Sequence, residues 1–107
     1  MSMLKIITYT TSTGKEPFTT WLDKLDTRDR TIILARLARV RLGNLGDCKS
    51  IKDGEGILEL RIDYGPGYRI YLGRKGVTLI VILIGGDKGS QTKDIAKAKM
   101  YWRTFKE

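Results

Sequence analysis

The strongest constraint on the fold comes from residues 57–94, where three strand patterns follow one another with two tight turns between them. In residues 57–63, apolar and charged side chains alternate, as expected of a strand with one buried face. Pro66-Gly67 then suits the centre of a type II turn, because proline fixes φ and glycine accepts a positive φ. Residues 77–84 are almost entirely apolar and predict a central strand covered on both faces. The segment therefore predicts three antiparallel strands.

The middle strand gives the predicted sheet a basic and aromatic face. Residues 68–72 place apolar side chains on one face and Arg69 and Tyr71 on the other. Arg61 lies on the polar face of the preceding strand, and Gly76 suits the turn that closes the second hairpin. We expect this face to lie beside the buried third strand and to meet solvent.

Patterns before these strands predict one more strand and two helices. The β-rich run at residues 4–9 predicts a strand that joins the sheet. Pro17 suits the first position of a short helix. The apolar face of this helix contains Phe18, Trp21, Leu22 and Leu25. A second helix is expected to follow a cap at Asp26 or Thr27 and to end near Leu42. Its predicted buried side contains Ile33, Leu34, Leu37 and Val40, and its opposite side contains Arg28, Arg36 and Arg39.

Two further segments complete the predicted fold. Residues 44–56 are glycine-rich and polar and predict a loop, and Ser90 is expected to cap a last helix. The buried stripe of that helix contains Ile95, Ala98, Trp102 and Phe105. The sequence thus predicts an α+β fold in a single domain over residues 1–107. We expect a small antiparallel sheet of about four strands, packed by two N-terminal helices and one C-terminal helix.

The charge of the chain indicates a polyanionic partner. Lysine and arginine together number 20 against 12 acidic residues, which gives a formal net charge of +8. Such a domain typically binds nucleic acid, an acidic protein or an anionic membrane. The longest apolar run, residues 77–84, is much shorter than a membrane-spanning helix. With no signal-peptide pattern and Cys48 as its one cysteine, the chain is expected to be cytoplasmic.

The absence of histidine limits the chemistry of any active site. Ser-His-Asp and Cys-His catalysis are excluded, and so are histidine-containing and all-cysteine zinc sites. We therefore expect no metal and no cofactor. Acid–base chemistry must use lysine, tyrosine, aspartate or glutamate, with arginine and lysine stabilising negative charge.

The predicted face brings together residues that suit a polynucleotide. The candidates for catalysis are Arg61, Lys88 and Lys93, and those for RNA binding are Lys49, Lys52, Arg69, Tyr71 and Tyr64. Several cations suit a phosphate backbone, and the faces of Tyr64, Tyr68 and Tyr71 suit stacking with unpaired bases. A simpler explanation for Arg61 is an ion pair with Glu59.

Cleavage of RNA by this face needs a phosphate ligand and a base. Arg61 suits the first role, because its guanidinium binds two phosphate oxygens and stays protonated. A lysine base would need its pKa lowered by about 3 units. Glu59 or Asp94 needs no such shift, although neighbouring arginines weaken either as a base. The sequence leaves the identity of the base open.

Three stretches resemble a known family: EPFTTWLDKL, LELRIDYGPGYRIYLG and ILIGGDKGSQTKDIAKAKMYW. Together they resemble the HigB-type addiction module killer branch of the RelE/ParE toxin superfamily. The resemblance implies the RelE-like fold and a toxin of a type II toxin–antitoxin module. It also implies a ribosome-dependent endoribonuclease that cuts messenger RNA, and a cognate antitoxin resembling HigA with a helix-turn-helix. By matching position, Arg61 takes the role of the arginine that holds the phosphate, and Lys88 that of a basic residue after the last strand.

Two alternatives stay open at this point. ParE-like members of the superfamily act on DNA gyrase without cleaving RNA, and fold likeness does not choose between these targets. The chain could also be a nucleic-acid-binding module without toxicity. The C-terminal tyrosine of RelE has no counterpart near Asp94, and the histidines of some HigB toxins are absent.

Overall fold

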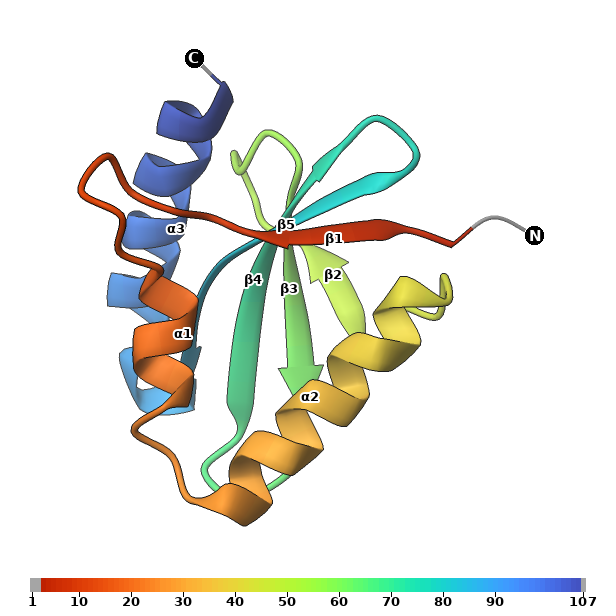
Figure 1. Cartoon of the computed structure of the whole chain (residues 1–107), viewed down its shortest axis with the longest axis vertical. Helices are drawn as coiled ribbons and strands as arrows, with labels where there is room; N and C mark the ends of the chain where they lie inside the picture. The colour runs from red at the N-terminus through yellow and green to blue at the C-terminus, as the bar shows by residue number, and fades with distance from the viewer. Residues whose placement is uncertain (1–2, 107) are drawn as a thin grey trace.

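A mixed five-stranded sheet forms the centre of the protein, with strand order β1-β5-β4-β3-β2 (Figure 1). The computed structural model describes residues 3–106. The strands are β1 (Lys5–Thr8), β2 (Cys48–Ser50), β3 (Ile57–Ile62), β4 (Tyr68–Lys75) and β5 (Leu79–Asp87). The helices are α1 (Pro17–Leu22), α2 (Thr27–Arg41), the 3₁₀ turn η1 (Lys88–Ser90) and α3 (Gln91–Lys106).

The sheet has helices on both faces, and each face carries its own apolar cluster (Figure 1). On one face, α1 and α2 pack on β3, β4 and β5. The buried residues of this cluster include Phe18, Ile33, Val40, Leu60, Ile70 and Ile82. On the other face, α3 packs through Ala98 and Trp102. The buried strand residues beneath it include Ile57, Tyr71, Val81 and Leu83.

The α+β class is confirmed, but the sheet differs from the predicted one. It has five strands rather than about four, and it is mixed because β1 runs parallel to β5. The additional strand, β2, lies in the segment predicted as a loop and pairs with β3. A strand of only three residues is too short to show a period-2 pattern.

The central hairpins follow the predicted pattern. β3 pairs antiparallel with β4, and β4 with β5. Gly67 has the positive φ that was predicted, +81°, but the turn lies one residue earlier: the Gly67 N–H donates to the Tyr64 carbonyl oxygen at 3.1 Å, so Gly65 and Pro66 are its central residues. The pairing of β4 with β5 shifts register between Tyr71 and Leu72, and as a result Leu83 and Ile84 both pack on the α3 side.

Two predictions for α2 are wrong. Arg36 was expected on the solvent-facing side, but it is buried and its Nη2 donates to the carbonyl oxygen of Leu45. Leu34 was expected in the core, but 51% of it is exposed. α2 packs on the sheet and also against the segment that follows the helix. The buried side of α2 therefore includes Arg36 and excludes Leu34, unlike the side that the apolar residues suggested. Asp26 caps the helix as predicted, accepting a hydrogen bond from the Asp29 N–H at 2.8 Å.

A tyrosine on β4 links the sheet to the first turn of α2. The Tyr68 hydroxyl donates to the Asp29 carboxylate. Burial, and then this carboxylate, raise the pKa of Tyr68 to about 12. An unfolded chain loses the same proton near pH 10. The neutral tyrosine therefore stabilises the fold fully below pH 10, and this contribution is lost as the pH rises towards 12.

Tyr68→Phe is expected to reduce the loss of stability between pH 10 and about 12, because the titrating hydroxyl is gone. At neutral pH the same variant should be less stable by about 1.5–3 kcal/mol, because a hydrogen bond to a charged group is lost. Urea unfolding at several pH values measures both effects. Tyr64→Phe is the matched control at neutral pH, since the Tyr64 hydroxyl forms no hydrogen bond within residues 3–106. If the free energy of unfolding of Tyr68→Phe fell between pH 10 and about 12 as steeply as that of the wild type, the loss of stability in this range would not come from Tyr68.

Candidate functional site

A basic hollow lies at the end of the sheet where β3 and β4 meet the turn that joins them. Its volume is about 260 Å³, and we call it the arginine hollow. Its lining residues are Asp47, Arg61, Ile62, Asp63, Gly67, Arg69 and Lys88. Three of the candidate residues, Arg61, Arg69 and Lys88, are thus brought together from β3, β4 and η1.

The pairing of the strands places the two arginines side by side. Arg61 and Arg69 are direct partners across β3 and β4, and Arg69 is in turn the partner of Gly86 on β5. Residues that oppose each other in a sheet point to the same face. The next pair along this face, Glu59 and Tyr71, is completely buried against α3. By contrast, the side chain of Arg61 is 35% exposed, so the cover provided by α3 stops before the arginine pair.

Glu59 fixes the orientation of Arg61. The Arg61 Nε lies 3.1 Å from Glu59 Oε1, so the ion pair suggested by the sequence is present. Glu59 Oε2 accepts hydrogen bonds from Gln91 Nε2 at 2.8 Å and from the Tyr71 hydroxyl at 3.4 Å. Burial, and then the charge of Glu59, raise the pKa of Tyr71. Because Nε alone contacts Glu59, the terminal nitrogens of Arg61 remain available to a ligand.

The other two cations of the hollow have no carboxylate partner within residues 3–106. The Nε of Arg69 is buried and has no hydrogen-bond acceptor there. Lys88 is exposed and follows β5 directly. A buried donor without an acceptor is rare in folded proteins and is unfavourable. Arg69 and Lys88 therefore bring positive charge to the hollow that no carboxylate of the described chain pairs with, although Asp47 and Asp63 also line it.

The structure separates the remaining candidates from this hollow. Lys93 lines a different hollow, between α1 and α3. Lys49 and Lys52 line a third, above Glu59 and Gln91. Tyr64 is half-buried and packs against the α1–α2 side of the core.

The expectation that tyrosines form a stacking platform is wrong for two of them. Tyr71 is completely buried and Tyr68 is nearly so. The alternation of residues correctly placed Arg69 and Tyr71 on one face, but it does not show that α3 covers this face as far as Tyr71. Neither ring presents a surface to a base.

Neither of the proposed carboxylate bases faces the arginine hollow. Glu59 is buried and occupied by three donors. Asp94 is buried above Gly86, where it accepts a hydrogen bond from the Ser90 hydroxyl. The carboxylates that do line the hollow, Asp47 and Asp63, were missed. The proximity of Asp47 to Arg61 depends on the pairing of β2 with β3, since the Arg61 N–H donates to the Asp47 carbonyl oxygen at 2.9 Å, whereas Asp63 follows Arg61 by two residues in the chain.

This arrangement suits the binding of a phosphodiester. Two arginines and one lysine from three elements line the hollow together with two aspartates. Within the described part of the chain, no group of three or more acidic, cysteine or histidine residues could hold a metal ion. No helix among these residues is long and apolar enough to cross a membrane.

A related protein exists in Haemophilus influenzae (strain ATCC 51907 / DSM 11121 / KW20 / Rd). It is 50% identical to this chain over 84 residues, which cover 78% of this chain and 83% of the relative. The chain belongs to the family of this Haemophilus protein. The relative is described as an uncharacterized protein, so membership of its family brings no activity with it. No protein-family model matches the sequence.

Proposed function

We propose that the protein is the toxin of a type II toxin–antitoxin module and cleaves messenger RNA on the ribosome. The observation that carries the proposal is that Arg61, Arg69 and Lys88 line one hollow in which neither Arg69 nor Lys88 has an ion-pair partner within residues 3–106. The resemblance of the sequence to HigB-type toxins of the RelE/ParE superfamily supports the same function and suggests a RelE-like fold. The net charge of +8 supports a nucleic-acid ligand.

In the proposed reaction, the RNA supplies its own nucleophile. The 2′-hydroxyl attacks the adjacent phosphorus, a 2′,3′-cyclic phosphate forms, and the bond to the 5′-oxygen breaks. Arg61 and Arg69 hold the phosphate oxygens and stabilise the charge that develops on them. Asp47 or Asp63 accepts the proton of the 2′-hydroxyl, and Lys88 donates one to the leaving 5′-oxygen. No metal or cofactor has a part in this scheme.

The proposal includes a protein partner. A cytoplasmic antitoxin resembling HigA, with a helix-turn-helix for DNA binding, would neutralise the toxin. An acidic segment suits the basic surface, because opposite charges favour association. A neighbouring gene that encodes such a protein would support this partner.

Expression of the protein in growing bacteria tests the proposal. Translation is expected to stop, and primer extension should find messages cut within codons. The alternative of a ParE-like toxin predicts intact messages, double-strand DNA breaks and a later effect on translation. A nucleic-acid-binding module without toxicity predicts normal growth. Either of these two outcomes would overturn the ribonuclease proposal.

A further inference from the structure

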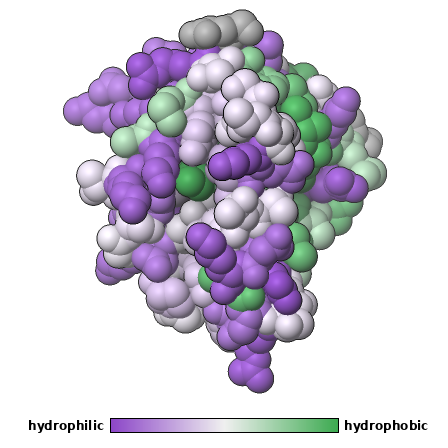
Figure 2. All heavy atoms as spheres, turned by 60° about the vertical axis from the view of Figure 1, so that its left-hand side comes forward, coloured by the Kyte–Doolittle hydropathy of each residue, from purple (hydrophilic) through white to green (hydrophobic). Residues whose placement is uncertain are grey.

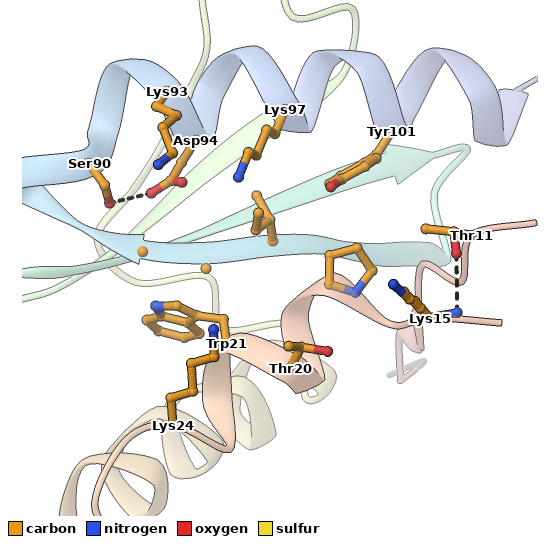
Figure 3. Close-up of a pocket in the computed structure, with 14 residues that line it drawn as sticks. Thr11, Lys15, Thr20, Trp21, Lys24, Ser90, Lys93, Asp94, Lys97 and Tyr101 are labelled. Carbon is orange, nitrogen blue, oxygen red and sulfur yellow. Dashed lines mark hydrogen bonds between the residues drawn. The ribbon is translucent and has the colours of Figure 1, made fainter. Parts of the chain in front are cut away.

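A second basic hollow, of about 480 Å³, lies between α1 and α3 and has no role in the reaction proposed above (Figure 3). We call it the lysine hollow. It forms because β1 pairs with β5 only as far as Ile82. Beyond that residue the edge of β5 is left without a neighbouring strand, and α1 and α3 border it from the two faces of the sheet.

Two glycines at the end of β5 form the floor of the lysine hollow. A Cβ on Gly85 would lie 2.4 Å from the ring of Trp21, and one on Gly86 would lie 1.8 Å from Asp94 Oδ2. Both distances are far below van der Waals contact. Successive residues of a strand face opposite sides of the sheet. Trp21 and Asp94 therefore approach the backbone from opposite faces, and any side chain on either glycine would displace them.

The walls of the hollow carry a concentration of positive charge. Its four lysines are Lys15, Lys24, Lys93 and Lys97, and Figure 3 shows their amino groups directed between α1 and α3. None of them forms an ion pair with a carboxylate of residues 3–106. The one carboxylate in the lining, Asp94, is buried and hydrogen-bonded to Ser90. Figure 2 shows the same side of the molecule, where hydrophilic side chains surround small apolar areas.

Two aromatic rings line the hollow as well, and each is held in place by another ring. Trp21 packs edge-on against Tyr68, with ring centroids 5.7 Å apart. Tyr101 stacks on Tyr9 at 5.0 Å. Both Trp21 and Tyr101 remain partly exposed in the lining. The hollow thus combines ammonium groups for an anion with ordered flat surfaces for a planar group.

We propose that the lysine hollow binds a nucleotide, with its phosphates between the lysines and its base against Trp21 or Tyr101. The volume lies within the range of about 300–1,000 Å³ that is usual for small-molecule sites. Phosphate alone would use the lysines but not the rings, whereas a base adds stacking.

The nucleotide comes either from solution or from an RNA strand. An RNA source is compatible with the position of η1, because Ser90 lines the lysine hollow and Lys88 lines the arginine hollow. The binding site does not depend on the ribonuclease proposal, and it is tested by binding rather than by cleavage.

Isothermal titration calorimetry with ATP, sodium tripolyphosphate and single-stranded oligouridylate tests the inference. Lys15→Ala/Lys97→Ala removes one ammonium group from each side of the hollow and should weaken ATP binding by about tenfold or more, because hydrogen bonds to charged groups are lost. Lys5→Ala/Arg28→Ala removes the same charge from exposed positions outside the hollow and should retain the wild-type affinity. Circular dichroism checks that both double variants are folded.

The comparison of ligands separates the possible sources. ATP that binds more tightly than tripolyphosphate, and that loses affinity only in Lys15→Ala/Lys97→Ala, supports a site for a free nucleotide. Oligouridylate that competes with ATP and shows the same selective loss supports an RNA strand as the source. Equal affinity for ATP and tripolyphosphate would overturn the inference, because the rings would then contribute nothing. An equal loss in both double variants, or no binding of ATP or RNA, would overturn it too.

Discussion

Arg61→Ala is expected to lower the rate of messenger-RNA cleavage by about 100- to 1,000-fold, which is the usual effect of removing one donor that stabilises a transition-state oxyanion. Arg61 is the arginine of the hollow whose orientation is fixed by a buried carboxylate, so its terminal nitrogens are ordered before RNA binds. Primer extension on messages from expressing cells, at matched protein levels, measures the change. Growth arrest should be relieved in parallel.

The fold of this variant has to be checked, because Arg61→Ala leaves the buried Glu59 without its cation. Lys88→Ala avoids this problem, since Lys88 is exposed and has no ion pair within residues 3–106. We expect it to reduce cleavage while the unfolding midpoint stays at the wild-type value. Arg28→Ala, on the exposed side of α2, is the matched control and should cleave like the wild type. Undiminished cleavage by both Lys88→Ala and a folded Arg61→Ala would remove the arginine hollow as the active site.

Trp102→Ala is expected to destabilise the fold by about 3–5 kcal/mol, the range for deleting a large aromatic side chain from a core. Trp102 is 2% exposed and is the largest side chain of the cluster beneath α3. Its ring stacks on Phe105 with centroids 5.6 Å apart, and its Nε1 donates to the Glu55 carbonyl oxygen at 2.8 Å. The substitution would thus leave a cavity and also release the segment before β3.

Urea unfolding measures this effect. Met100→Ala provides the control within the same helix, because Met100 is exposed, and its change should stay within about 0.5 kcal/mol. A loss below about 1 kcal/mol for Trp102→Ala would mean that α3 is not anchored to the sheet by this residue.

The parts of the fold that were predicted are those with local signals. The alternation in residues 57–63 predicted β3, but the register that places Arg61 opposite Arg69 did not follow from the sequence, because residues 63–67 form a longer connection than the predicted Pro66-Gly67 turn. The direction of β1 was not predictable in the same way. A residue pattern identifies a strand, but whether it runs parallel or antiparallel to its neighbour depends on the path of the chain between them.

The candidate site was predicted only in part for a related reason. The place of Lys88 after the last strand was predicted, although β5 runs through both glycines to Asp87 rather than ending at Ile84. Lys93 lies on α3, whose apolar stripe predicted which side of the helix is buried but not which part of the sheet that side covers. The same uncertainty hid the burial of Tyr71 and of Asp94, since both depend on where α3 rests.

The parallel pairing of β1 with β5 has a consequence for the order of assembly. It joins Lys5–Thr8 to Leu79–Ile82, so β1 must wait for β5, which follows it by about 70 residues. The hairpins of β3, β4 and β5 connect neighbours in the chain and can form first. While the polypeptide emerges from the ribosome, the sheet therefore stays open at one edge until most of the chain has been synthesised. If the protein stops translation as proposed, each copy would complete its sheet only after the ribosome had synthesised β5.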